Sequence, residues 1–66
     1  MNTWQYVGKR VKVVFINDDA LEGYVSSAET GANSGREGFA SLDLETAKRG
    51  TIMAYEDEIK SITVTN

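Results

Sequence analysis

The chain contains no cysteine and no histidine among its 66 residues. Without thiols it cannot form a disulfide framework, and without thiolate or imidazole it lacks the usual ligands of a structural zinc site. We therefore expect no cofactor and no metal. A domain this short buries only about 60% of the surface that its unfolded chain exposes. Because disulfides and structural zinc are excluded, self-association is the remaining way to stabilise a domain with such a small core.

The chain also lacks a surplus of basic residues, because 7 Lys and Arg stand against 10 Asp and Glu and give a net charge of -3. This balance opposes broad adhesion to nucleic acid or to an anionic membrane, so an RNA site would have to be local. The segment Met1–Gln5 has neither the basic region nor the apolar run of a signal peptide, and no stretch reaches the roughly 18 apolar residues of a membrane span. We expect a soluble, cytoplasmic protein that does not contact membranes.

Apolar residues recur along the chain with a period of two, which is typical of β-strands. The pattern predicts five strands, at residues 10–16, 20–28, 39–45, 51–55 and 59–64. The three residues Asn17, Asp18 and Asp19 favour a tight hairpin turn between the first two strands. The glycine-rich segment 28–38 predicts an exposed loop.

The same period assigns an inward face to each early strand. The expected inward residues are Val11, Val13 and Phe15, then Leu21, Gly23 and Val25, then Ala40, Leu42 and Leu44. Ile59 and Ile62 cannot share one face of a regular strand, so a bulge or a short helical turn is predicted near Glu58.

The first residues favour a short helix that Thr3 caps and Gly8 closes. With the strands, this helix completes a single domain over residues 1–66. The predicted fold is all-β, a small five-stranded antiparallel barrel with a short N-terminal helix.

Three segments resemble the Sm-like family of small β-barrels, which includes the LSm and Hfq-type proteins. They are Val7–Val13, Leu21–Val25 and Tyr55–Ile62, and the order of elements agrees over nearly the whole chain. Other SH3-like barrels share much of this pattern. The resemblance implies an oligomeric ring, in which the fourth strand of one subunit pairs with the fifth strand of the next, and it implies RNA binding. In such a barrel Gly23 would permit a sharply bent strand.

The residues that contact RNA in this family are replaced in the present chain. Gly38–Ser41 and Ala54–Glu56 stand where Sm and LSm proteins have an Asp and Asn pair and an Arg-Gly element. In the Hfq register Tyr55 matches, but Glu56 and Asp57 occupy the positions of Lys and His. Carboxylates repel phosphate, so the resemblance indicates a bacterial-type member without the usual RNA contacts.

Two sets of residues are candidates for binding. For RNA at a non-family site they are Phe39 and Tyr55, which could stack on bases, with Lys9, Arg10 and Lys12. For a protein partner they are Trp4, Tyr6 and Tyr24. The alternative for the aromatic residues is that they fill the core or an interface.

Three further groups of polar residues have alternative interpretations. Lys48 and Arg49 could join the basic residues of the first strand in a phosphate-binding patch, or they could be solvated surface. The acidic residues 56–58, alone or with Asp18, Asp19 and Glu22, could hold a hard cation or form an exposed corner. The glycines around Arg36 could form an anion-binding nest or an exposed mobile loop.

A barrel this small fills its interior with its own side chains, which leaves no concave pocket for catalysis. We therefore expect no enzyme. The predicted function is a non-enzymatic Sm-like binding or assembly module, such as an RNA-associated oligomeric ring. The alternatives are an SH3-like protein–protein interaction module and a small structural or regulatory protein that binds no RNA. The expected partners are further copies of the chain, RNA at a non-family site, or a protein.

Overall fold

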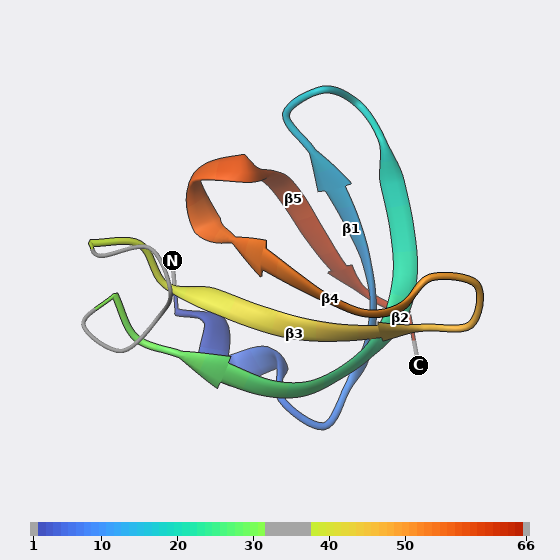
Figure 1. Ribbon diagram of the computed structural model, residues 1–66, viewed down its shortest axis with the longest axis horizontal. Coiled ribbons are helices and arrows are strands. Elements are labelled where there is room, and N and C mark those ends of the chain that lie inside the picture. Colours follow the sequence, from blue (N-terminus) through green and yellow to red (C-terminus); the bar gives the residue numbers. More distant parts are fainter. Residues whose placement is uncertain (1, 32–37, 66) are drawn as a thin grey trace.

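The computed structural model describes residues 2–31 and 38–65. Five antiparallel strands form one sheet in the order β4-β3-β2-β1-β5 (Figure 1). The strands are β1 (Arg10–Phe15), β2 (Ala20–Glu29), β3 (Ser41–Thr46), β4 (Gly50–Tyr55) and β5 (Ile59–Val64). Two short 3-10 helices, η1 (Thr3–Tyr6) and η2 (Glu56–Glu58), precede β1 and join β4 to β5. The predicted all-β fold of five antiparallel strands is confirmed.

The long strand β2 bends and divides its pairing between two neighbours. Its first half pairs with β1, from Ala20 to Tyr24, and its second half pairs with β3, from Tyr24 to Glu29. Gly23 lies at the point of division, where a Cβ atom would overlap the backbone carbonyl oxygen of Glu45. Only glycine fits this approach, at the position where β2 passes from one neighbouring strand to the other.

The core lies on the inner face of the bent sheet. Its buried apolar residues are Val11, Val13, Val25, Ala28, Leu42, Leu44, Ala54 and Ile59. Two bulges keep these residues pointing toward the core. An extra residue in one strand shifts the alternation, so the residues beyond the bulge again face inward. Ser26 is the extra residue in β2, between Val25 and Ser27.

The second bulge explains the irregular spacing of isoleucines in β5. Val14 pairs with Ser61, but Phe15 pairs with Ile59, so Lys60 is left without a cross-strand partner in the ladder. Ile59 and Ile62 therefore both pack against the core. Both devices that the sequence predicts near Glu58 are present, because η2 ends at Glu58 and the bulge follows at Lys60.

The N-terminal helix forms where it is predicted, but its cap is different. Asn2 caps η1, since its side-chain oxygen accepts a hydrogen bond from the Trp4 backbone N–H at 3.2 Å. The prediction that Thr3 is the cap is wrong, because Thr3 is the first residue of η1 and its side chain is buried. Gly8 follows the helix with a φ of +84° and donates its N–H to the Val25 carbonyl at 2.8 Å.

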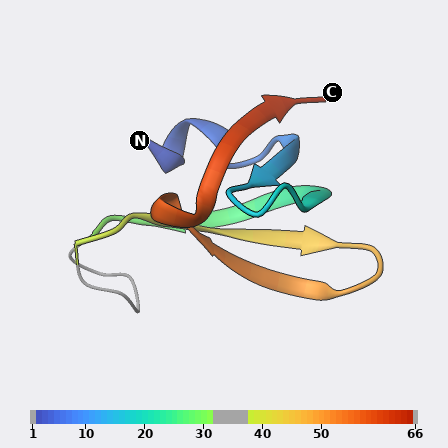
Figure 2. The ribbon, with the colours of Figure 1, turned by 90° about the horizontal axis from the view of Figure 1, so that it is seen from above.

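The two edge strands of the sheet are β4 and β5. They meet at η2 and diverge toward their other ends, so the barrel stays open on this side (Figure 2). Within residues 2–31 and 38–65 no ladder joins β4 to β5. Each of these strands therefore presents one backbone edge without a partner strand.

We expect Gly23→Ala to lower the free energy of unfolding by about 3 kcal/mol, at the upper end of overpacking costs, because the new methyl group meets backbone that cannot rotate away. Gly50→Ala is the matched control. Gly50 has open space around it, and alanine there costs only about 1 kcal/mol for its positive φ. Urea unfolding measures both variants, and equal losses would contradict the steric account of the bend.

Candidate functional site

The predicted RNA-binding residues fall into two separate groups in the structure. Tyr55 pairs with Ser41 at one end of the β3–β4 ladder, and Phe39 lies just beyond that end. Arg10 belongs to the row of residues that passes through Tyr24 and Glu45. Glu45 is four residues from Ser41, so about 13 Å of strand separates the two rows. The aromatic and basic candidates therefore do not form one site.

Glu56 has a structural role beside these aromatic residues. Its backbone N–H donates to the Ala40 carbonyl at 2.8 Å, and its carboxylate accepts from the Ala40 N–H at 3.2 Å. The hydrogen bond from the Ala40 N–H contributes to a lowered pKa of the Glu56 carboxyl. A carboxylate that accepts a backbone hydrogen bond therefore lies next to Tyr55, at a position where the Hfq-type resemblance implies an RNA-binding Lys.

The three predicted protein-contact residues have different surroundings. Trp4 is 54% exposed on η1, and Tyr24 is 42% exposed on β2 between Arg10 and Glu45. Tyr6 packs against the core. Trp4 and Tyr24 are therefore available to a partner, whereas Tyr6 mainly supports the position of η1.

A groove of about 330 Å³ opens where β3 separates from β2. The β2–β3 ladder ends at the pair of Tyr24 and Glu45, so the first residues of β2 and the β3–β4 turn lie apart. We call this the basic groove. Its lining residues are Arg10, Leu21, Glu22, Thr46, Ala47, Lys48 and Arg49.

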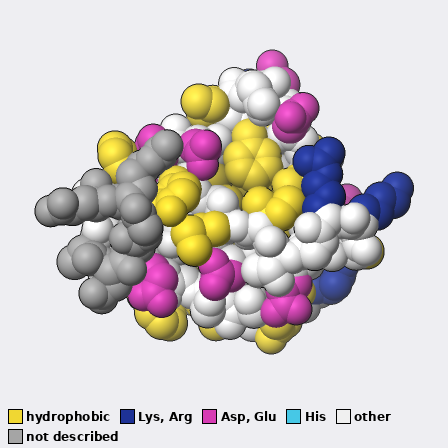
Figure 3. Space-filling view, viewed as in Figure 1, with side chains coloured by type: hydrophobic (Ala, Val, Ile, Leu, Met, Phe, Trp, Pro, Cys, Tyr) yellow, Lys and Arg dark blue, Asp and Glu magenta, His cyan; other side chains and the backbone are white. Residues whose placement is uncertain are grey.

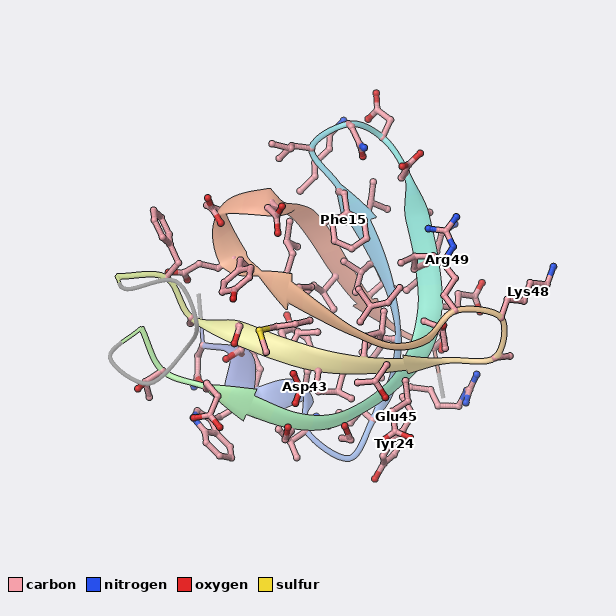
Figure 4. The ribbon with its side chains drawn as sticks, in the orientation of Figure 1. Phe15, Tyr24, Asp43, Glu45, Lys48 and Arg49 are labelled. Carbon is pink, nitrogen blue, oxygen red and sulfur yellow. The ribbon has the colours of Figure 1, made fainter. Side chains whose placement is uncertain are left out.

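Three cationic residues and two apolar residues line the basic groove. Arg10 comes from β1, and Lys48 and Arg49 come from the β3–β4 turn, where Figure 3 shows Lys and Arg side chains beside apolar ones. In Figure 4 Arg49 extends back across β2, whereas Lys48 extends away from the turn. Of the basic patch that the sequence suggests, the groove unites these three residues and leaves out Lys9 and Lys12.

Local hydrogen bonds hold the β3–β4 turn in shape. The Thr46 hydroxyl donates to the Gly50 carbonyl at 2.9 Å and accepts from the Arg49 backbone N–H at 2.9 Å. Gly50 has a φ of +68°, which glycine adopts without strain. The turn therefore positions the backbone of Lys48 and Arg49 beside β2.

A second feature is the end of the β1–β2 hairpin, residues 16–19, which we call the hairpin tip. The Phe15 carbonyl accepts from the Asp18 N–H at 2.9 Å, and the Phe15 N–H donates to the Asp19 carbonyl at 2.8 Å. Asp18 has a φ of +70°. This is a three-residue hairpin loop with its last residue left-handed, a common solution for antiparallel strands.

The hairpin tip combines an exposed aliphatic side chain with carboxylates. Ile16 is 67% exposed, and it lines a groove of about 300 Å³ with Phe15, Asn17, Asp19 and Glu58. The Ile16 N–H donates to the Glu58 carbonyl at 2.9 Å, which ties the tip to η2. The Lys60 ammonium lies 3.0 Å from the Asp18 carboxylate. Acidic groups therefore outnumber basic groups around Ile16.

Two of the remaining sequence interpretations concern ions. Among the described residues, no three carboxylate, His or Cys side chains gather in a way that could hold a metal ion. The proposed glycine nest around Arg36 lies largely outside the described residues.

Comparison with known proteins finds no match: no protein-family model, no curated protein and no solved structure is similar to the chain at a significant level. In the described part of the chain, neither 3-10 helix has the length or the apolar character to cross a membrane.

We expect Asp18→Ala to lower the free energy of unfolding by about 1 kcal/mol, because alanine is strained at a left-handed φ. Asp18→Gly removes the same side chain without that strain, so its stability should equal or exceed that of the wild type. Lys60→Met is the control, since it removes only the exposed ion pair, which is worth at most about 0.5 kcal/mol. If the three variants lose equal free energy of unfolding in urea, the ion pair rather than the turn conformation stabilises the hairpin tip.

Proposed function

We propose that this protein is a non-enzymatic assembly module of the Sm-like type, whose copies associate by pairing the β4 edge of one with the β5 edge of the next. The observation behind this proposal is the pair of unprotected edges on one small, open sheet. Pairing the two edges would supply the backbone partners that each strand lacks.

The β4 edge has none of the features that protect sheet edges in monomeric proteins. Such edges normally have a charged side chain, a proline or a bulge. The strand Gly50–Tyr55 contains no charged residue and no proline, and its pairing with β3 is regular from end to end. Met53, in the middle of this strand, is 47% exposed. This strand is suited to accept another strand.

The β5 edge is protected only at its beginning. The bulge and the charge of Lys60 lie near the start of the strand, and the following residues, 61–64, are uncharged. Val64 at the far end is 42% exposed. An uncharged stretch on each edge therefore offers complementary backbone without like-charge repulsion.

The resemblance to Sm-like proteins supports the same proposal. The order of elements is a short N-terminal helix, four consecutive strands, a 3-10 turn and a returning fifth strand. The resemblance implies the same order for Sm-like proteins. A domain of this size also gains from sharing its core with a neighbour. Ile52 on β4 and Ile62 on β5 lie on the inner faces of the diverging edges and are only partly buried.

The proposal does not include RNA binding at Phe39 and Tyr55. The carboxylate of Glu56 lies beside them, and the basic residues of β1 are on a separate row of the sheet. The exposure of Trp4 favours a second candidate function, a protein–protein interaction module that grips its partner with this indole. In that case the chain would bind its partner as a monomer.

Light scattering after size exclusion, at about 0.15 M salt so that exposed charges are screened, tests the assembly proposal. We expect a mass several times the 7.2 kDa of a single chain. Met53→Lys and Val64→Lys should each shift the protein to the monomer, because they place a charge on an edge that is buried in the assembly.

Tyr24→Lys is the matched control, since it introduces the same charge at a similarly exposed position on an interior strand. It should leave the mass unchanged. A strictly monomeric wild type at high concentration would rule out edge pairing. Loss of assembly in Tyr24→Lys alone would assign the contact to the outer face of β2.

A further inference from the structure

The basic groove has the chemistry to bind an aliphatic side chain flanked by carboxylates. Leu21 and Ala47 contribute apolar surface to the groove, and Arg10, Lys48 and Arg49 line the same groove. These three are among only 7 Lys and Arg in a chain of net charge -3. Their convergence on one groove therefore runs against the overall charge of the protein, and it would attract an acidic group.

No aromatic side chain lines the groove in the described part of the chain. A nucleobase would find no ring on which to stack, and stacking supplies much of the affinity for single strands. Glu22 on the wall also opposes a continuous phosphate backbone. The lining therefore favours a protein segment over nucleic acid.

The hairpin tip of this same chain has the complementary chemistry. Ile16 is 67% exposed, and Asp19 and Glu58 line the surface beside it. We propose that the hairpin tip of one copy docks into the basic groove of a second copy. Ile16 then contacts Leu21 and Ala47, and the carboxylates face Arg49 and its cationic neighbours.

The contact is head-to-tail, because the two surfaces consist of different residues. In Figure 1 the β1–β2 hairpin and the β3–β4 turn project from different corners of the molecule. Each copy therefore offers one tip and one groove, and a chain of such contacts closes into a ring or extends as a fibre. No residue of β4 or β5 lines either surface, so the contact goes beyond edge pairing and does not depend on it.

Sedimentation velocity on proteins with the Met53→Lys substitution tests the docking apart from edge pairing. At about 0.02 M salt, where the Debye length is roughly 20 Å, these proteins should still associate through tip and groove. At about 0.15 M salt they should be monomeric. Arg49→Glu should weaken the association at low salt by about tenfold or more, because it places a like charge opposite the tip.

Lys9→Glu is the matched control, since it makes the same change in net charge at an exposed residue outside the groove. It should leave the association within about twofold of the parent, as expected for a charge outside the interface. Ile16→Ser, which removes only the exposed aliphatic group, should weaken association without changing the charge. Far-UV circular dichroism verifies that each variant is folded.

A charge exchange provides the decisive measurement. Asp19→Arg should weaken self-association, and a mixture of Asp19→Arg and Arg49→Glu copies should associate more tightly than either alone. Equal weakening by Lys9→Glu, or no recovery in the mixture, would overturn the proposal. A third result would also overturn it. If Arg49→Glu abolishes binding of a fluorescent oligouridine but leaves self-association unchanged, the groove binds RNA.

Absence of association at low salt in the Met53→Lys proteins would also overturn the docking proposal. That result does not bear on edge pairing, because edge pairing is tested by light scattering of the protein with unchanged β4 and β5, at the higher salt concentration.

Discussion

The close passage of the Glu45 carbonyl over Gly23 determines how the two halves of this small sheet meet. Because β3 approaches β2 at the one residue without a side chain, β2 can leave β3 at this point and continue along β1. The inner faces of both halves then enclose one core, from Val11 on β1 to Leu44 on β3. A side chain at Gly23 would separate β2 from β3 where they must be closest.

The same bend creates the groove on which the docking proposal depends. Beyond the pair of Tyr24 and Glu45 the two strands are no longer bonded, and the basic groove lies in the resulting fork. The bend turns the β3–β4 half of the sheet toward the β1–β5 half, but within the described residues β4 and β5 do not pair, so the sheet does not close on itself. The groove is therefore a direct consequence of the steric constraint at Gly23.

Local sequence patterns were sufficient to predict the strands and their facing. Three signals each extend over only a few residues, so they can be recognised from the sequence alone. They are the alternation around Val11 and Val13, the turn at Asn17–Asp19 and the irregular spacing of Ile59 and Ile62. The N-cap was misassigned because Asn2 and Thr3 are both good caps, and burial of Thr3 decides between them.

The candidate sites were harder to predict, because they depend on register between distant segments. Arg10 meets Lys48 and Arg49 only through the point at which the β2–β3 ladder ends. Likewise, the sequence shows Glu56 as an acidic residue next to Tyr55, but its bond to the Ala40 N–H follows from the pairing of β3 with β4. The sequence identifies the chemical groups, and the pairing of strands determines which of them meet.

The strand order also has a consequence for how the protein folds. From β1 to β4 each strand pairs with the next one along the chain, so these contacts can form early and locally. The β5 strand alone returns across the whole sequence to pair with β1. Until β5 is in place, Val11 and Val13 lie on an open edge of the sheet, and the growing chain exposes apolar surface of the kind that promotes aggregation. We therefore expect completion of the sheet to be a late, long-range step, at which this small domain is exposed to misassembly.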